Sequence, residues 1–216
     1  MSCPSCLPST KGTDKFFTRT SKRYLKKFKR KGLTKQQQLL IEGIRKSNVA
    51  DKSILDIGCG IGMMHLTLLK EGASNSTGID LAAGMLAGAR NLAKESSLEG
   101  RTSYIDGDFL AVHASAPNAD ITILDKVVCC YENVGDLVKL STAKTNRTYA
   151  LSYPKPGWIR RVVFGTPILM AKIFRLSFRP YLHDWNAMTE SIVGAGFTPV
   201  YEATTFLWMN RVFERR

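Results

Sequence analysis

A short run of glycines is the part of this sequence best suited to hold a small ligand. Asp56 is followed by Gly58, Gly60 and Gly62, after an apolar run and before a stretch with helical spacing. Glycine lets the backbone approach a ligand closely, and a helix N-terminus presents free N–H groups with a partial positive charge. The dinucleotide fingerprint needs a glycine at its sixth position, where a count from Gly58 reaches Met63. The pattern is therefore an alternating-glycine loop preceded by an acid, and it does not match that fingerprint.

Acidic residues recur at the ends of the next three strand-like runs. Asp80 ends the second run and is followed by Leu81, Asp108 comes after the third with Phe109 beside it, and Asp125 ends the fourth. A carboxylate accepts two hydrogen bonds from a vicinal diol, which a hydroxyl or an amide does less well. In a parallel sheet flanked by helices, ligands lie at the carboxyl ends of the strands. If these runs form such a sheet, we expect the acids to surround one ligand.

The glycine loop and its preceding acid resemble motif I of the class I S-adenosylmethionine-dependent methyltransferases. The resemblance covers about residues 50–153 and a terminal helix and strand pair. It implies S-adenosyl-L-methionine as the cofactor, with Asp56 beside the methionine amino group and the loop amides beside its carboxylate. It also implies Asp80 at the ribose hydroxyls and Asp108 at the adenine amino group, with Phe109 as a ring wall. The cofactor-binding residues expected in all are Asp56, Gly58, Cys59, Gly60, Gly62, Asp80, Leu81, Asp108, Phe109 and Asp125.

The later part of the chain resembles, more loosely, Mg-protoporphyrin O-methyltransferase and related bacterial small-molecule methyltransferases. The residues that carry this likeness are the region after the fourth strand, residues 152–154 and the apolar, basic run 158–179. Such a run can cap an apolar, acidic substrate or lie in a membrane interface, and it can also be a helix pair packed over the sheet edge. We expect a small methyl acceptor that is apolar or acidic.

Methyl transfer from a sulfonium needs little acid–base chemistry beyond holding donor and acceptor in line. Where the acceptor must lose a proton, His183 and Tyr131 are the catalytic candidates, with His65 and Asp125 as further bases. His183 precedes a predicted helix just after the basic run, and a histidine can take a proton near neutral pH. The alternative is a histidine that only bonds a nearby helix cap.

The five cysteines predict neither a disulfide framework nor a metal site. Their number is odd, and the N-terminus lacks a secretion signal. Cys3 and Cys6 have zinc-knuckle spacing, but no second pair supplies the two further ligands that a structural zinc needs. Cys129 and Cys130 lie where a nucleophile would be of interest, because cytosine-5 methyltransferases attack the ring with a cysteine. The flanking residues differ from that family, and we expect both thiols to be inert.

Strand-like and helix-like runs alternate from residue 53 onward, which predicts a sheet with helices on both faces. The fold class expected is α/β, a Rossmann-like doubly wound sheet, mostly parallel with an antiparallel C-terminal strand, plus N-terminal helices and a helical insert. The expected strands are 53–57, 76–79, 102–105, 121–124, 148–152, 199–204 and 206–213. The expected helices are 14–30, 34–46, 63–71, 82–95, 134–142 and 184–195.

The chain length predicts a single domain over residues 1–216, and the resemblance implies that it is a methyltransferase domain. Its expected parts are a flexible leader (1–12), basic N-terminal helices (13–47), a cofactor-binding core (48–153), a substrate-side insert (154–182) and a C-terminal helix and strands (183–216).

The net charge of +13 is concentrated in two segments. Residues 11–31 carry +9 and residues 155–179 carry +6, so the remaining residues sum to −2. Basic clusters attract phosphates, acidic lipids or acidic substrates, although a solvated helix face that aids solubility explains them equally well. The core is therefore near neutral, and a partner that needs positive charge would meet these two segments.

Three functions remain open at this point. A small-molecule methyltransferase is the first choice, an RNA methyltransferase that holds phosphates with the arm at 11–31 is the second, and a non-catalytic cofactor-binding module is the third. Peripheral membrane contact is a further expectation, and no obligate protein partner is inferred. The chain lacks a run of about 18 uncharged apolar residues and a secretory signal, so we expect a cytoplasmic location.

Overall fold

A single seven-stranded sheet forms the centre of the computed structural model, which describes residues 8–155, 181 and 183–216. The strand order is β3-β2-β1-β4-β5-β7-β6. All neighbouring pairs from β3 to β5 are parallel, whereas β7 runs antiparallel to both β5 and β6. The strands are β1 (Ser53–Ile57), β2 (Asn75–Asp80), β3 (Thr102–Asp106), β4 (Ala119–Asp125), β5 (Thr145–Pro154), β6 (Phe197–Thr204) and β7 (Trp208–Arg215). The expected α/β fold class, with its one antiparallel C-terminal strand, is confirmed.

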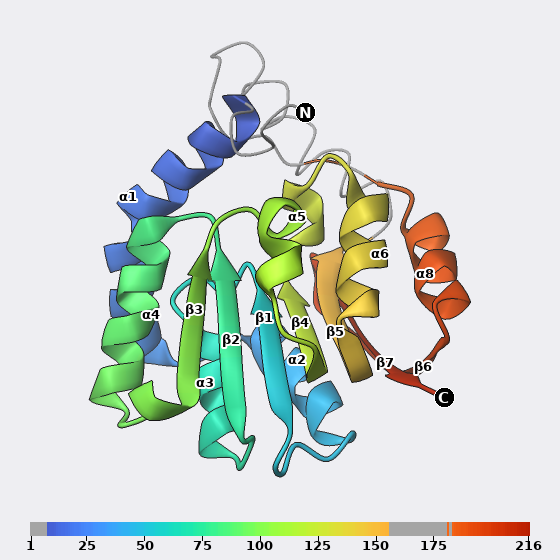
Figure 1. The fold of residues 1–216 in the computed structure, drawn as a ribbon, viewed down its shortest axis with the longest axis horizontal. Helices are drawn as coiled ribbons and strands as arrows, with labels where there is room; N and C mark the ends of the chain where they lie inside the picture. The colour runs from blue at the N-terminus through green and yellow to red at the C-terminus, as the bar shows by residue number, and fades with distance from the viewer. Residues whose placement is uncertain (1–7, 156–180, 182) are drawn as a thin grey trace.

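Helices cover both faces of this sheet (Figure 1). They are α1 (Pro8–Lys31), α2 (Lys35–Arg45), α3 (Met63–Lys70), α4 (Ala83–Glu95), α5 (Phe109–Val112), α6 (Val134–Ala143) and α8 (Trp185–Gly194). One core cluster joins the strands to α5, α6 and α8, and a second joins them to α2, α3 and α4. Side chains alternate between the two clusters along β1, where Ile54 belongs to the second and Leu55 to the first.

The strand order reverses between β1 and β4, because the chain first builds the β1-β2-β3 half and then returns to the other side of β1. Loops from the two halves diverge at such a switch point and leave a crevice at the carboxyl ends of the strands. The glycine loop follows β1, and the loop that begins at Lys126 follows β4. The two halves therefore present their first loops to the same crevice.

Local sequence signals account for several helix ends. Thr34 accepts a hydrogen bond from the Gln37 backbone N–H, and the Gln37 side chain returns to the Thr34 backbone, so the expected capping box begins α2. Asp184 caps α8 through the backbone N–H groups of Asn186 and Ala187.

Two elements differ from the expectation. The flexible leader was expected to reach residue 12, but α1 already begins at Pro8. A proline is well suited to the first helical position, because its fixed φ matches a helix and its missing N–H would lack a partner there. The short helix α5 was not expected, since four residues are too few to show a period. The run 158–179 lies outside the described residues.

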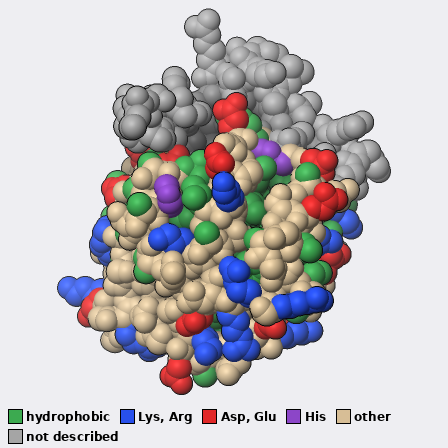
Figure 2. Space-filling model, turned by 45° about the vertical axis from the view of Figure 1, so that its right-hand side comes forward, with side chains coloured by type: hydrophobic (Ala, Val, Ile, Leu, Met, Phe, Trp, Pro, Cys, Tyr) green, Lys and Arg blue, Asp and Glu red, His purple; other side chains and the backbone are tan. Residues whose placement is uncertain are grey.

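Helix α1 packs along α4 beside the glycine loop. Its Phe17, Leu25 and Phe28 contact a small cluster formed by Ile61, Ala82 and Met85. The other side of α1 is exposed and carries most of its lysines and arginines. On the face turned forward in Figure 2, in contrast, Lys and Arg are interspersed with Asp and Glu. No helix among the described residues is long and apolar enough to cross a membrane.

Candidate active site

Three glycines give the loop after β1 its shape. Gly58, Gly60 and Gly62 all have positive φ, between 55° and 80°, which other residues rarely adopt. A Cβ at Gly58 would lie 2.5 Å from Val127, and one at Gly62 would lie 2.9 Å from the His65 ring. A Cβ at Gly60 would meet no atom within 4 Å. The loop is therefore packed tightly at both ends and open at its centre.

Asp80 fastens this loop to the turn after β2. Its Oδ2 accepts a hydrogen bond from the Gly60 backbone N–H at 2.7 Å, and its Oδ1 accepts one from the Ala82 N–H at 2.8 Å. Burial raises the pKa of Asp80 to about 6, although these two N–H groups act in the opposite direction. Each carboxylate oxygen keeps a second lone pair, so both ribose-type hydroxyls could still be bound. Leu81, the next residue, is partly buried in the same turn.

Asp56 is buried beneath the loop and is paired with a histidine. Its Oδ2 lies 2.8 Å from His65 Nδ1, and both side chains are at most 2% exposed. The His65 Nε2 lies 3.3 Å from the hydroxyl of Tyr104 on β3. Burial raises the pKa of Asp56, while the contact with His65 lowers it. Asp56 and His65 are thus buried together beneath the glycine loop. Contact of Asp56 with a methionine amino group stays a prediction.

The loop amides expected to hold a carboxylate are mostly engaged within the chain. The Cys59 N–H bonds the Ile79 carbonyl, the Gly60 N–H bonds Asp80, and the Gly62 N–H bonds the Cys59 carbonyl. Helix α3, however, begins at Met63 without a side-chain cap. The first N–H groups of a helix have no partner within it. Here the His65 backbone N–H bonds the Asp56 carboxylate, which leaves the N–H groups of Met63 and Met64 as the candidate donors at the start of α3.

The loops after β3 and β4 are joined at Tyr131. Its hydroxyl accepts a hydrogen bond from the Phe109 backbone N–H at 3.2 Å and lies beside the Asp108 carboxylate. Burial, followed by the nearby Asp108, raises the pKa of Tyr131 well above its usual value, which keeps the phenol protonated at neutral pH. Asp108 caps α5 through the Leu110 N–H, and Phe109 is buried in the core. Tyr131 is thus suited to donate a hydrogen bond, and it neither gives up its proton readily nor acts as a base.

Asp125 is held by three side chains at the end of β4. The amides of Gln36 and Gln37 on α2 donate to its two carboxylate oxygens, each at 2.9 Å, and the Ser152 hydroxyl donates at 2.7 Å. Sequence reasoning placed Asp125 in the site but missed both glutamines. They lie almost 90 positions away along the chain, where no local pattern could have linked them to Asp125.

His183 also reaches the loop after β4. Its Nε2 lies 2.8 Å from the Tyr131 backbone carbonyl, which can only accept, so that nitrogen carries the proton. Burial lowers the pKa of His183, and so favours the neutral ring. The structure therefore brings the two expected catalytic residues into contact, through the backbone of one of them. Sequence reasoning missed Tyr24 of α1, which lies near Asp125 and Cys130.

The cysteines near the site are free thiols. Cys59 is buried, and burial raises its pKa well above the usual value, which makes it unreactive. Cys129 and Cys130 both donate to the Lys126 carbonyl, at 3.6 and 3.5 Å. A hydrogen bond from Cys130 lowers the pKa of Cys129, whereas the pKa of Cys130 is raised. Cys3 and Cys6 lie outside the described residues.

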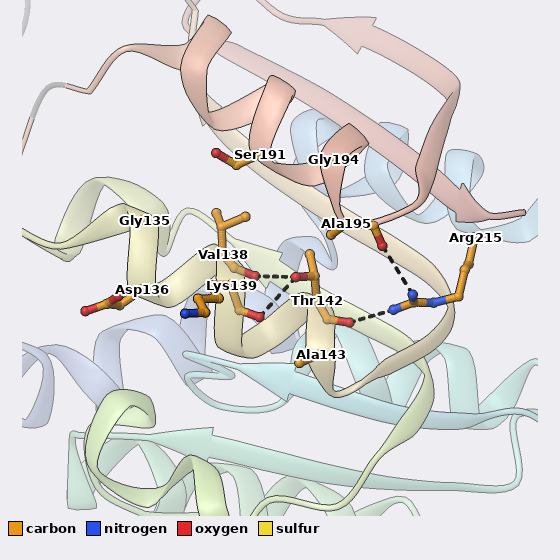
Figure 3. A pocket seen from close by; sticks show the side chains of 10 residues that line it. All are labelled: Gly135, Asp136, Val138, Lys139, Thr142, Ala143, Ser191, Gly194, Ala195 and Arg215. Carbon is orange, nitrogen blue, oxygen red and sulfur yellow. Dashed lines mark hydrogen bonds between the residues drawn. The ribbon is translucent and has the colours of Figure 1, made fainter.

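A groove of about 520 Å³ lies elsewhere, between α6 and α8 (Figure 3). Arg215 lines it, but the guanidinium donates to the carbonyls of Ala195, Thr142 and Thr145 and so caps the ends of both helices. None of the expected site residues lines this groove. The crevice at the carboxyl ends of the strands remains the candidate site.

Comparison with known proteins finds a methyltransferase domain in the part of the chain that builds this crevice. A family model for a methyltransferase domain matches residues 54–141, which span the glycine loop and the three acids after it. This part of the chain is therefore similar to methyltransferase domains. The chain is 29% identical over 90 residues to protein arginine N-methyltransferase 1 of Saccharomyces cerevisiae, covering 41% of the chain and 26% of that relative. It is 33% identical over 70 residues to the ribosomal protein L11 methyltransferase of Haemophilus influenzae, covering 32% and 24%. The matches thus span about a quarter of each curated relative.

Solved structures share the fold over a larger part of the chain. The magnesium protoporphyrin IX methyltransferase of Synechocystis, with bound S-adenosylhomocysteine, superposes with a TM-score of 0.75 at 17% identity, covering 96% of this chain and 100% of that one. A putative sarcosine dimethylglycine methyltransferase of Galdieria sulphuraria gives 0.66 at 11%, covering 83% and 84%. The cyclase SpnF gives 0.62 at 13%, covering 83% and 81%, so this likeness describes the fold alone.

Proposed function

We propose that this chain transfers a methyl group from S-adenosylmethionine to a small, apolar or acidic acceptor. The observation that carries the proposal is Asp80, whose carboxylate holds both the Gly60 and the Ala82 amides while keeping acceptor sites for a diol. The family model over residues 54–141 supports the cofactor half of the proposal. The similarity in fold to small-molecule methyltransferases supports the acceptor half.

The residues present fit the cofactor. The open space at Gly60 leaves room beside the loop, and the uncapped start of α3 offers N–H donors for a carboxylate. Asp80 would bind the ribose, and Asp108 would lie at the adenine. Asp56, Gly58, Cys59, Gly62, Leu81, Phe109 and Asp125 complete the proposed cofactor-binding set. When bound, the cofactor supplies an activated methyl group on a sulfonium.

The role of the chain is then chiefly to position the acceptor. Tyr131 is protonated at neutral pH, so it would donate a hydrogen bond to the acceptor or to the loop. His183 has a lowered pKa, and because its Nε2 carries the proton that bonds the Tyr131 carbonyl, its Nδ1 would take up a proton from the acceptor. His183 and Tyr131 are the proposed catalytic residues. A single domain over 1–216 and a cytoplasmic location are proposed with this function.

The test combines binding with transfer. Isothermal titration with S-adenosylmethionine should give saturable binding by the wild type and strongly weakened binding by Asp80→Ala. A labelled-methyl assay against a small-molecule extract and total RNA, side by side, should label the small-molecule fraction. Absence of cofactor binding by the wild type would refute the proposal.

An RNA methyltransferase is the second candidate, because the exposed side of α1 carries many bases and a single acid, Asp14. Transfer to total RNA that falls steeply with salt would favour it. Cofactor binding without transfer to either fraction would favour a non-catalytic module.

A further inference from the structure

Lys126 has an unusual backbone at the mouth of the crevice. It directly follows Asp125 at the end of β4 and has φ of +62°. The other described non-glycine residues with positive φ are Asn48, Asp51 and Ser97, whose short polar side chains suit turns. A long side chain gains nothing from this conformation, and such outliers cluster at functional sites. The position therefore calls for a reason that lies in the lysine side chain.

The turn is fixed by polar contacts of the Lys126 backbone. Its N–H donates to the Ser152 hydroxyl at 2.8 Å, and its carbonyl accepts from the thiols of Cys129 and Cys130. These contacts use only backbone atoms, so any residue at position 126 could make them. They explain the shape of the loop, and they leave the choice of lysine unexplained.

The Lys126 side chain points from β4 toward the start of β7. Its Nζ lies 5.3 Å from the centre of the ring of Trp208, the first residue of β7. Since β5 lies between β4 and β7 in the sheet, the ammonium reaches over the carboxyl end of β5. This half of the crevice lies away from the loops after β1, β2 and β3, which hold most of the proposed cofactor-binding residues. The ammonium therefore lies on the acceptor side.

The Lys126 ammonium is near Asp125 but makes no hydrogen bond with it. The Nζ lies 3.9 Å from Asp125 Oδ2, which is too long for a hydrogen bond. Asp125 already accepts from Gln36, Gln37 and Ser152 at 2.7 to 2.9 Å. Its side chain is 10% exposed, compared with 31% for Lys126. The ammonium thus keeps donors that can face a ligand.

Lys126 stands out among the loops that follow the first four strands. In the described turns that directly follow β1, β2, β3 and β4, it is the only basic side chain, among several acids. The turn between β6 and β7, which precedes Trp208, carries Phe206, which is 73% exposed. The exposed Lys155 follows β5 and donates its backbone N–H to the Leu207 carbonyl of this turn. The acceptor side therefore combines positive charge with exposed apolar surface, and Lys126 is the lysine next to the β4 carboxylate.

We propose that Lys126 is a specificity-determining residue that binds an anionic group, a carboxylate or a phosphate, on an otherwise apolar methyl acceptor. This inference rests on the proposed methyltransferase function and names its substrate class. The positive φ then places the ammonium over β5 and Trp208, where an acceptor meets the cofactor crevice. The conformational strain is retained because the charge is needed there.

The test separates charge from backbone strain. The small-molecule fraction of a cell extract is divided by anion exchange at pH 7 into retained and unretained compounds, and each part is assayed with labelled S-adenosylmethionine. A phosphatase-treated portion of the retained part distinguishes phosphates from carboxylates. The variants are Lys126→Met, Lys126→Arg and Lys126→Asn, since asparagine accepts positive φ without charge. Lys70→Met, an exposed lysine at the end of α3, is the matched control.

The wild type should label the retained part. Lys126→Met and Lys126→Asn should lower the initial rate with that part at least tenfold, Lys126→Arg by much less, and Lys70→Met should match the wild type. The dissociation constant for S-adenosylmethionine should stay within about twofold in all of them. The thermal unfolding midpoint of Lys126→Asn should be no lower than that of Lys126→Met, because its backbone strain is smaller. A purely structural lysine would instead lose stability and transfer together.

Three results would overturn the inference. Labelling confined to the unretained part would refute the anionic acceptor alone, and the proposed function would stand. Equal transfer by Lys126→Met and wild type would refute the role of Lys126. A wild type that binds the cofactor but labels neither part would refute the proposed function, and the inference with it.

Discussion

Asp80 shows how one carboxylate can link the fold to ligand binding. Burial raises its pKa from 3.8 to about 6, so the free chain begins to protonate Asp80 just below neutral pH. Protonation removes acceptor capacity that a diol needs. Affinity for S-adenosylmethionine should therefore be constant above about pH 7 and weaken below pH 6, by up to roughly tenfold per pH unit. Isothermal titration from pH 5 to pH 8 measures this dependence.

Asp80→Asn should weaken binding roughly tenfold or more at pH 7.5, because hydrogen bonds to a charged group contribute about 1.5–3 kcal/mol. The remaining affinity should hardly change with pH. Asp51→Asn is the matched control, since Asp51 is exposed in the turn before β1, at the opposite end of the sheet. A flat wild-type profile between pH 5 and 8 would contradict the assigned role of Asp80.

At the residue scale, the pair of Asp56 and His65 should also contribute to the stability of the fold. His65→Leu would leave the Asp56 carboxylate buried without its partner, which typically costs about 3–5 kcal/mol. Urea unfolding should show a loss of that order. The double variant Asp56→Asn/His65→Leu should lose clearly less than the sum of the two single variants. Additive losses would mean that the two side chains do not interact. His113→Leu, at a half-buried histidine, serves as the control.

At the scale of elements, the packing of α1 on α4 depends on a glycine. A Cβ at Gly84 would lie 2.8 Å from Thr18 Cγ2 and 3.0 Å from Thr18 Cα, so α1 would have to shift. Gly84→Ala should therefore speed tryptic cleavage within α1 several-fold, although alanine favours α4 by itself. Gly100→Ala is the control, because a Cβ there meets nothing within 4 Å. Equal digestion of the two variants would refute a tight α1–α4 contact.

The sequence predicted most elements because their signals are local. The capping box at Thr34, the cap at Asp184 and the alternating strands and helices all lie within a few residues of the structure they specify. The start of α1 was missed because residues 8–12 are polar and include Gly12, so only Pro8 indicated a helix. Contacts across the sheet could not be predicted. The bonds from Gln36 and Gln37 to Asp125 depend on how α2 packs, and no pattern near either end encodes that packing.

At the scale of the whole molecule, the basic residues of α1 are separated from the crevice, where Lys126 is the basic residue of the loops after β1 to β4. The exposed side of α1 carries Arg19, Lys26 and Arg30, whereas its other side packs against α4 and the small cluster at the glycine loop. The described residues that build the crevice are mainly acidic or uncharged. Function as an RNA methyltransferase would need the exposed bases, and function on a small molecule would not.

Reversing three of these charges tests which function the molecule performs. The variant Arg19→Glu/Lys26→Glu/Arg30→Glu should bind S-adenosylmethionine within about twofold of the wild type and transfer methyl groups to the small-molecule extract at a similar rate. Screening reduces the effect of distant surface charges, since the Debye length is about 8 Å at physiological salt. A control variant with three reversals elsewhere, Lys70→Glu/Lys94→Glu/Lys139→Glu, has the same net charge. If RNA were the acceptor, the α1 variant alone would lose transfer, and the wild-type rate would fall steeply between about 50 and 200 mM salt, because each phosphate contact releases a counterion.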